Sequence, residues 1–480
     1  MAGGSDGGGG DVVRQVRDAA GAVVGDVAAG RWSRAGIVGV SLGVVAAGAV
    51  AGVALERLTV GRDMRRRAEA ELDAAAAFGS LRGTPLRVPA ADGTELYVEL
   101  DGSGWAGTDP VVAREVAHAA PTAAGDPAEA ADPAGPAEQG RTTASPRSFR
   151  RSWLGRRRGA SAEPAAPGPL GGVLSGVGSW LGLPPTPPLT VVFTHGYCLN
   201  QDSWHFQREA FREGLRLVFW DQRSHGRSER SRSFLGGEPA SIDQLGGDLG
   251  AVIDAVAPTG PLVLVGHSMG GMTIMALAAQ RPELFAERVA GVAFLGTTSG
   301  SWRGVTLGLP GVGAKMFHRV GPGIIKALGR QAALVERGRR LSSELTAAVY
   351  HRFSFGSDDI DPALARFAQQ LLEATPVDVV AEFFPVFPAH EKTAALATLS
   401  EIPTLVMAGE QDLLTPPAHS AAIAAQLPDA ALEIVPETGH LLMLERPALV
   451  DARLADLLER AAAHCGAPLP PHVHDLARRA

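Results

Sequence analysis

Residues 261–271 read PLVLVGHSMGG, an apolar run that ends in a serine set between glycines. The first five residues are typical of a strand buried on both faces of a sheet, and the small and apolar residues that follow predict a helix. Between such a strand and helix, the pattern G-x-S-x-G indicates a sharp turn that exposes the serine hydroxyl at the end of the strand. Gly266 and Gly270 fit this turn because a Cβ at either position would press on the neighbouring strand or helix. We therefore predict Ser268 as a nucleophile.

A serine hydroxyl is a weak nucleophile unless a histidine takes its proton and an acid orients that histidine. Asp412 follows the strand predicted at 402–407, and His440 follows the strand predicted at 432–435. Taken singly, the aspartate would be interpreted as a turn residue and the histidine as a surface imidazole, and Glu410 is a competing acid. Their order along the chain and their places at strand ends together predict a catalytic triad with the serine.

Two backbone N–H groups are expected to stabilise the oxyanion that forms when the serine attacks a carbonyl. One belongs to Met269, which begins the helix after the turn, where the helix dipole favours negative charge. The other belongs to Tyr197, in the loop that follows the strand predicted at 189–194. In the same loop we interpret His195 as structural rather than catalytic, and Cys198 as a buried thiol because it lacks a basic neighbour.

Apolar, β-branched runs alternate with helical stretches from residue 189 onward, which predicts a mostly parallel sheet flanked by helices. Upstream, Asp92-Gly93 between alternating apolar residues predicts a hairpin over 83–101 with a two-residue turn. Residues 299–401 break the alternation, and their helical, phenylalanine-rich pattern predicts an inserted cap. The strands are predicted at 189–194, 217–220, 261–265, 289–295, 404–407 and 432–435, and the helices between them at 242–256, 271–280 and 419–427.

The composition excludes several classes of protein. With 45% hydrophobic and 20% charged residues among 480, the chain can bury a core, which excludes wholesale disorder. A formal net charge of -7 argues against a protein whose main task is to bind nucleic acid. Only two cysteines, Cys198 and Cys465, are present, which excludes a disulfide scaffold and a zinc site made of cysteines alone.

Residues 35–55 read AGIVGVSLGVVAAGAVAGVAL, without a charged side chain. As a helix this stretch would be about 31 Å long, close to the ~30 Å hydrocarbon core of a bilayer. We predict a single membrane span, with a cleaved signal peptide and a buried helix as the alternatives. It would join a flexible tail at 1–34 to a juxtamembrane helix at 56–82. Arginines on both sides of the span leave open which face of the membrane holds the catalytic domain.

Composition, rather than a motif, is the basis for predicting the insertion and the C-terminal segment. Residues 102–185, rich in alanine, glycine and proline, predict a disordered insertion within a domain over 83–465. Arginines and aromatic residues at 147–158 could touch anionic lipid, but we favour a solvated loop that balances its acidic neighbour. Residues 466–480 are predicted as a C-terminal tail.

Five motifs carry a resemblance to a known family: HGYCLNQDSW (195–204), DQRSHGRS (221–228), GHSMGG (266–271), GEQD (409–412) and GH (439–440). In this order they resemble the α/β-hydrolase superfamily, most closely its actinobacterial esterase/lipase-like members with an N-terminal apolar segment. The resemblance covers about 83–101 and 186–465. It implies the α/β-hydrolase fold, a mostly parallel central sheet flanked by helices, with a helical cap insertion. The long insertion at 102–185 departs from the short connection usual in the family.

The resemblance also implies site residues. It gives five of them direct roles, namely Ser268 as nucleophile, Asp412 as acid, His440 as base, and Tyr197 and Met269 as backbone oxyanion donors. It implies that Asp221 and Arg223 are structural and brace loops near the site. A serine in the nucleophile position argues against the epoxide hydrolases and dehalogenases of this fold, which use a carboxylate there.

The expected activity is hydrolysis of a carboxylic ester through an acyl-enzyme, with no metal or organic cofactor implied. The expected partners are a small-molecule ester and, through residues 35–55, a membrane, but not nucleic acid. The apolar cap and the membrane segment suggest a lipid-like acyl group. An acyltransferase or thioesterase with the same triad is the alternative within the enzymes, and a non-catalytic binding protein on this fold is a more remote one.

Overall fold

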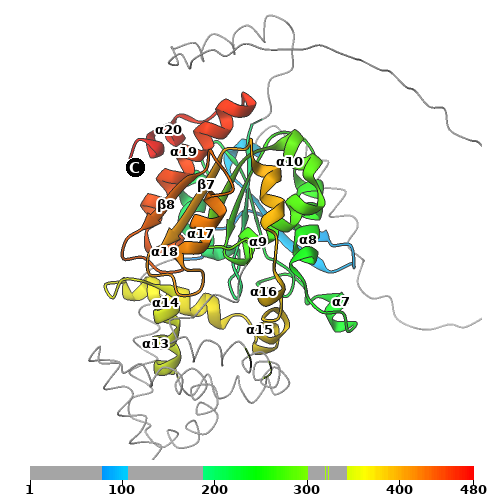
Figure 1. The fold of residues 1–480 in the computed structure, drawn as a ribbon, viewed down its shortest axis with the longest axis vertical. Helices are drawn as coiled ribbons and strands as arrows, with labels where there is room; N and C mark the ends of the chain where they lie inside the picture. Colours follow the sequence, from blue (N-terminus) through cyan, green and yellow to red (C-terminus); the bar gives the residue numbers. More distant parts are fainter. Residues whose placement is uncertain (1–77, 106–187, 301–318, 320–322, 324–342, 480) are drawn as a thin grey trace, which may run out of the picture. The chain divides into compact units, whose positions relative to one another are not determined.

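The computed structural model describes residues 78–105, 188–300, 319, 323 and 343–479 (Figure 1). The predictions for 1–34, 35–55 and 147–158, and all but the first residues of the insertion at 102–185, lie outside these residues. Within the described ranges no helix is both long and apolar enough to cross a membrane. Of the juxtamembrane segment at 56–82 only 78–82 is described, and this part is a turn followed by residues outside any helix or strand.

The described residues form one eight-stranded sheet in the order β1-β2-β4-β3-β5-β6-β7-β8. β2 is antiparallel to both of its neighbours, β1 and β4, and every other neighbouring pair is parallel, which confirms the mostly parallel sheet. β3, β5, β6 and β7 are buried along their whole length, as their continuous apolar sequences predict. The strands are β1 (Thr84–Pro89), β2 (Glu95–Asp101), β3 (Thr190–Thr194), β4 (Arg216–Trp220), β5 (Leu262–His267), β6 (Val289–Leu295), β7 (Thr404–Gly409) and β8 (Ala431–Val435).

The hairpin of β1 and β2 is confirmed, but its two-residue turn is wrong. Pro89 pairs with Glu95, so residues 90–94 make the connection, closed by a 2.9 Å hydrogen bond from Ala90 N to the Thr94 carbonyl. Asp92 accepts a hydrogen bond from the N–H of Thr94 (3.1 Å) and one from Arg223 (2.8 Å). These bonds to the Asp92 carboxylate favour the wider loop over a tight turn.

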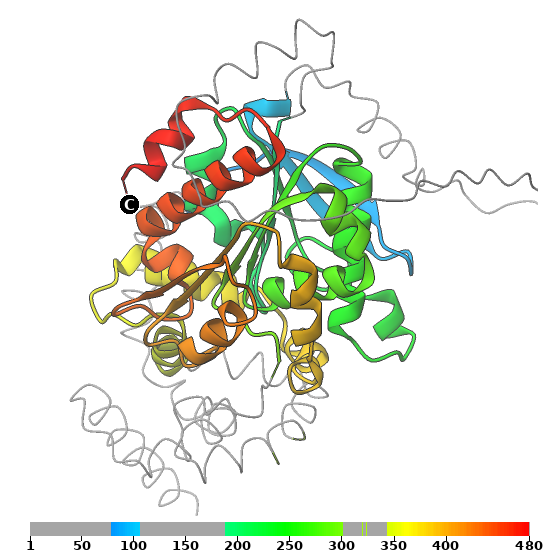
Figure 2. The same cartoon turned by 45° about the horizontal axis from the view of Figure 1, so that its top comes forward.

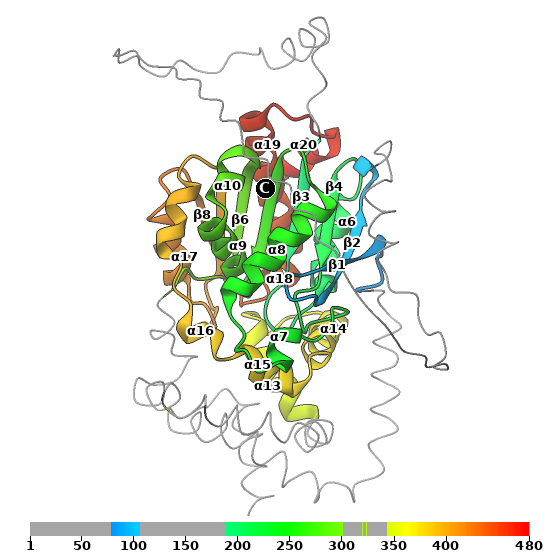
Figure 3. The same ribbon diagram turned by 90° about the vertical axis from the view of Figure 1, so that its right-hand side faces the viewer.

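Helices cover both faces of the sheet (Figures 1 and 3). One face packs against α6 (His205–Phe211), α19 (Pro447–Cys465) and α20 (Pro471–Ala477) through side chains such as Phe193 and Leu457. The other packs against α8 (Ile242–Val256), α9 (Met269–Gln280), α10 (Pro282–Arg288) and α17 (Pro417–Ala424) through side chains such as Val192 and Leu264. Phe193 and Val192 point to opposite faces because side chains alternate along a strand.

The predicted C-terminal tail contains a helix. α20 lies within 466–480 and packs on α19, with Val473 buried in the same apolar cluster as the sheet. The short elements that remain are η2 (Ser103–Trp105), η3 (Gln201–Trp204), α7 (Arg232–Leu235) and α18 (Leu442–Glu445).

The described part of the predicted cap at 299–401 is mostly helical. α13 (Ser343–Ser354), α14 (Pro362–Glu373), α15 (Val377–Phe383) and α16 (Val386–Ala389) lie together at one end of the sheet (Figure 2). Hydrogen bonds join α13 and α15 to the loops that follow β3, β4 and β8, so these helices cover the carboxyl ends of the strands. η5 (Thr393–Leu399) packs instead beside α9 and α10, in the apolar cluster on one face of the sheet.

Candidate active site

Ser268 stands at the turn between β5 and α9 in a strained backbone conformation, with φ 52° and ψ -118°. Such angles cost a non-glycine residue about 1–3 kcal/mol and recur at functional turns. The flanking glycines are required as predicted. A Cβ on Gly266 would lie 2.7 Å from the backbone of Gly270, and one on Gly270 would lie 2.1 Å from the carbonyl oxygen of Thr194. The turn is fixed further by a 2.9 Å hydrogen bond from Ser268 N to the carbonyl of Leu295 on β6.

Asp412 and His440 are brought together by the turns after β7 and β8. His440 Nδ1 lies 2.7 Å from Asp412 Oδ2, and both side chains are buried. The other carboxylate oxygen accepts hydrogen bonds from the N–H groups of Leu414 (2.8 Å) and Thr415 (2.9 Å), and the Thr415 hydroxyl donates to Oδ2 at 2.8 Å. The carboxylate therefore holds the Nδ1 proton of the imidazole and leaves Nε2 as the atom that can accept a proton. Glu410, the competing acid, is exposed.

The imidazole lies at the same edge of the sheet as the serine turn. His267, which precedes the serine, donates from Nε2 to the His440 carbonyl oxygen at 2.9 Å, and the two rings are 4.7 Å apart. A Cβ on Gly296, at the end of β6, would lie 3.4 Å from both Asp412 Oδ2 and His440 Nδ1. Among the hydrogen bonds between described residues, none joins Ser268 Oγ to the imidazole. Such contacts are often long in free enzymes and shorten when substrate binds.

The loop after β3 lies directly against the serine turn. A Cβ on Gly196 would come within 3.2 Å of the Ser268 Cβ and within 2.7 Å of His267 Nδ1. The next residue, Tyr197, donates from its hydroxyl to the Val380 carbonyl on α15 at 2.5 Å. Burial raises the pKa of this phenol well above its usual value, so it stays a neutral donor. The loop after β3 thus adjoins the serine turn at Gly196, the residue before Tyr197, and α9 begins at Met269, directly after the serine.

Two other residues of this loop were interpreted from the sequence. His195 is buried, bonds the Gly196 carbonyl through Nδ1 (2.7 Å) and accepts from Gln222 N at Nε2 (2.9 Å). Burial lowers its pKa to about 3, so the ring is neutral, and its structural role is confirmed. Cys198 is half-buried rather than buried, and its φ is 60°.

Asp221 and Arg223 brace the loop after β4, which confirms the structural role implied for them. Asp221 is buried and accepts from the N–H groups of Gln201 (2.7 Å) and Arg227 (2.8 Å). Arg223 binds both carboxylate oxygens of Asp248 on α8, at 2.6 and 2.5 Å. Bidentate geometry of this kind fixes the orientation of both side chains.

Two buried carboxylates near the site were not found from the sequence. Glu382 on α15 accepts from the Ser224 hydroxyl (2.9 Å) and from Arg230 (3.0 Å), and thereby ties the cap to the loop after β4. Glu445 on α18 accepts from the N–H of Gly439 at 2.7 Å. Both lie on helices, where an isolated glutamate is expected on a solvated face, so a single sequence carries no signal for their burial.

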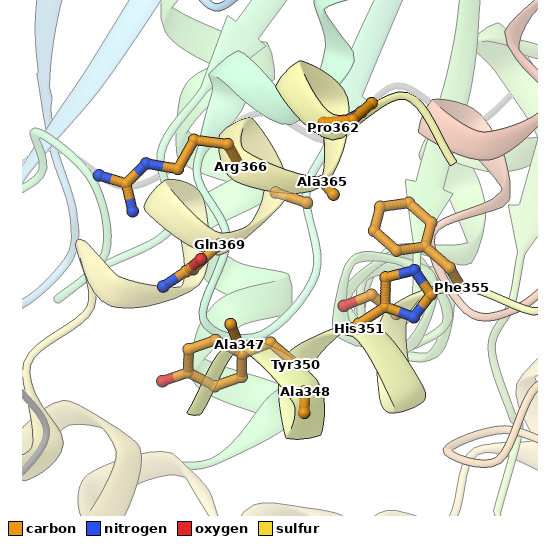
Figure 4. Close-up of a pocket in the computed structure, with 11 residues that line it drawn as sticks. Ala347, Ala348, Tyr350, His351, Phe355, Pro362, Ala365, Arg366 and Gln369 are labelled. Carbon is orange, nitrogen blue, oxygen red and sulfur yellow. The ribbon is translucent and has the colours of Figure 1, made fainter. Parts of the chain in front are cut away.

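A cavity of about 440 Å³ lies between α13 and α14 (Figure 4). Its wall is mostly apolar and includes Ala347, Ala348, Tyr350, Phe355 and Ala365. The backbone of Phe355 also backs the histidine loop, because a Cβ on Gly439 would lie 2.5 Å from its carbonyl carbon. Across the described ranges, no cluster of three or more histidine, cysteine, aspartate or glutamate side chains is arranged to hold a metal ion.

Comparison with known proteins places these features in a family. A family model described as alpha/beta hydrolase fold matches residues 190–447. The chain is 28% identical over 264 residues to the sn-1-specific diacylglycerol lipase ABHD11 of Mus musculus, covering 54% of this chain and 76% of that protein. It is 26% identical over 277 residues to the uncharacterized hydrolase YugF of Bacillus subtilis (strain 168), covering 56% and 90%. A solved thermophilic esterase from Thermogutta terrifontis is similar at 23% identity and a TM-score of 0.45, over 58% of this chain and 92% of that one.

Proposed function

Since the chain belongs to the alpha/beta hydrolase fold family, we propose that it is a serine hydrolase that cleaves carboxylic esters through Ser268, His440 and Asp412. The observation that carries the proposal is the buried 2.7 Å bond between Asp412 and His440 at the sheet edge where the strained serine turn also ends. Nucleophilic catalysis needs an acid that orients a histidine and a histidine that can take the serine proton, and the pair of Asp412 and His440 supports this assignment.

In the proposed reaction, Ser268 Oγ attacks the ester carbonyl carbon while His440 Nε2 takes the hydroxyl proton. Charge develops on the carbonyl oxygen, which receives hydrogen bonds from the N–H groups of Met269 and Tyr197. Each such donor is typically worth about 2.7–4 kcal/mol of barrier. The imidazolium then protonates the leaving alkoxide, which departs as the alcohol. Water, deprotonated by the same imidazole, releases the carboxylic acid and restores the serine.

Labelling with a fluorophosphonate probe tests this proposal. The probe should form an adduct on Ser268, and Ser268→Ala should lose the adduct and about 10⁴–10⁶-fold of ester turnover. Ser420→Ala is the matched control, because its buried hydroxyl on α17 has no hydrogen-bond partner among the described residues. If turnover survives in Ser268→Ala, or the folded wild type takes no adduct, the protein is not a serine hydrolase. The second outcome would favour a non-catalytic binding protein.

The acyl group that we propose is hydrophobic. The cavity between α13 and α14 is lined mainly by alanine and aromatic side chains, and its Phe355 also backs the loop that carries His440 (Figure 4). The similarity to a diacylglycerol lipase supports the same substrate class.

With p-nitrophenyl esters, kcat/KM should rise from acetate to medium chains. Ala365→Trp, which fills the cavity, should remove that rise, whereas Ala363→Trp on the same helix but outside the lining should keep it. A flat chain-length profile in the wild type would contradict a lipid-like substrate.

The acceptor of the acyl group is proposed to be water. An acyltransferase or thioesterase would form the same acyl-enzyme, so adduct formation does not separate these activities. Adding a competing alcohol and a thioester substrate to the assay does: ester product at the expense of free acid would indicate an acyltransferase, and preference for the thioester would indicate a thioesterase.

We also propose that residues 35–55 anchor the chain in a membrane as a single span, on the strength of their length and lack of charge. The full chain should stay with membranes through alkaline extraction, and a chain beginning at residue 56 should not. Protease access in intact and opened cells then decides which side holds the hydrolase domain. Release of the full chain by alkali would contradict the anchor.

A further inference from the structure

Glu445 is a buried carboxylate that binds backbone N–H groups of two separate loops. One oxygen accepts from Gly439 N at 2.7 Å, and the other accepts from Ser357 N at 2.8 Å, while Gly356 N lies 3.1 Å from both. Its exposed fraction is 7%, and no arginine, lysine or histidine among the described residues pairs with it. Within the part of the chain that the structure describes, backbone N–H dipoles are therefore the groups that compensate its charge.

A carboxylate without a countercharge is costly to bury unless its hydrogen bonds are well formed. Burial of Glu445 therefore requires that the N–H groups of Gly356, Ser357 and Gly439 stay within hydrogen-bonding distance of its carboxylate. Gly439 directly precedes His440, and residues 356–357 form the junction between α13 and α14. One side chain thus fixes the histidine loop and the cap junction together.

The two loops also touch through their backbones. A Cβ on Gly439 would lie 2.5 Å from the Phe355 carbonyl carbon, and a Cβ on Gly356 would lie 2.5 Å from the Thr438 carbonyl carbon. On the other side of the histidine, Leu441 N donates to the Ser354 carbonyl at 2.9 Å. The backbone on both sides of His440 is consequently bonded, either to Glu445 or to the end of α13.

We propose that Glu445 is a positioning residue for His440, an inference that rests on the proposed function. By binding Gly439 N it sets the path of the loop from which the imidazole reaches Asp412. The bond from His267 to the His440 carbonyl completes this support from the side of the serine turn. Glu445 itself does not touch the reacting atoms.

Glu445→Gln tests the proposal. The substitution keeps the size of the side chain but replaces one accepting oxygen with an NH₂ group, which would face an N–H donor. Misplacement of a reacting group by about 1 Å costs on the order of 10²-fold, so fluorophosphonate labelling of Ser268 and kcat should fall about 10- to 100-fold with little change in KM. The pH profile of kcat/KM, which reports the titration of the imidazole in the free enzyme, should shift as well.

Asp451→Asn is the matched control, since Asp451 is a buried carboxylate on neighbouring α19 that binds Gln207 rather than the histidine loop. It should label within about twofold of the wild-type rate and keep the wild-type pH profile. If Glu445→Gln does not fold, Glu445→Asp keeps the charge with a shorter reach, and it should show a smaller loss of kcat with a shifted profile. A folded Glu445→Gln, or failing that a folded Glu445→Asp, with wild-type kcat and pH profile overturns the inference. Wild-type labelling in the same experiment separates this result from failure of the proposed function.

Discussion

Gly270→Ala should separate the serine turn from the loop that lies against it. A Cβ at this position would lie 2.1 Å from the Thr194 carbonyl oxygen and 2.8 Å from that of His195, where ordinary contacts begin at 3.4 Å. Neither neighbour can move easily, because Thr194 is paired along β3 with β4 and β5, and a buried strand end does not rearrange like a flexible side chain.

The size of the effect follows from that overlap. The turn and the loop after β3 have to move apart by roughly 1 Å, a displacement that costs on the order of 10²-fold when it misplaces a reacting group. Overpacking of a buried site destabilises by about 1–3 kcal/mol, and the better helix propensity of alanine offsets less than about 1 kcal/mol of it. We therefore expect about 100-fold slower labelling of Ser268 and a Tm lower by several degrees.

Gly247→Ala provides the matched control for both readouts. Gly247 is an exposed glycine of α8, and a Cβ there would meet only Gln280 Oε1, at 3.9 Å. This variant should be more stable than the wild type by about 0.5–1 kcal/mol and should label at the wild-type rate. A Gly270→Ala variant that matches the wild type in both Tm and labelling rate would show that the serine turn does not depend on its contact with the loop after β3.

Three further outcomes follow from other contacts. Asp412→Asn should lower kcat by about 10⁴-fold in ester turnover, because the amide no longer fixes the imidazole tautomer, and its Tm should change far less than its activity. Arg223→Ala leaves Asp248 buried without its cation and should cost about 3–5 kcal/mol in urea unfolding, part of which Arg223→Ala with Asp248→Ala should recover. Burial raises the pKa of Asp451 from 3.8 to about 7, so the folded chain binds this proton more tightly than the unfolded chain. The free energy of unfolding should therefore fall as pH rises between these two values, and Asp451→Asn should flatten that slope in unfolding curves measured across the range.

The sheet and the serine turn were predictable because their signals are local. β5 is a short apolar run directly before G-x-S-x-G, and the glycines of that motif are needed for contacts that lie within the turn or at the next strand end. The order of acid and histidine after later strands was likewise predictable, because the carboxyl ends of parallel strands meet at one edge. The sequence analysis assigned Asp412 as the acid and left Glu410 as a competitor, since both follow β7. In the structure only the aspartate is buried and receives the N–H groups of Leu414 and Thr415, whereas Glu410 is exposed.

The structural features that the sequence did not predict depend on partners that are distant in the chain. Glu382 meets Ser224 across 158 positions, and Glu445 meets Ser357 across 88. Nothing near either glutamate in the sequence distinguishes it from an acid on a solvated helix face. α20 is a similar case, because a helix of seven residues is marginal alone and forms here by packing on α19.

The cap is bonded to the core at loops that also carry the proposed reaction. α15 binds the hydroxyl of Tyr197, whose backbone N–H is a proposed oxyanion donor, and the junction between α13 and α14 shares Glu445 with the residue before His440. A displacement of α15, or of that junction, has to break or bend a hydrogen bond to one of these loops. Since leaving a buried polar group without its partner costs free energy, the cap and the loops of the proposed site are coupled through direct contacts. Substitutions at these contacts should therefore change kcat, whereas a cap that served only as a wall of the cavity would change KM alone.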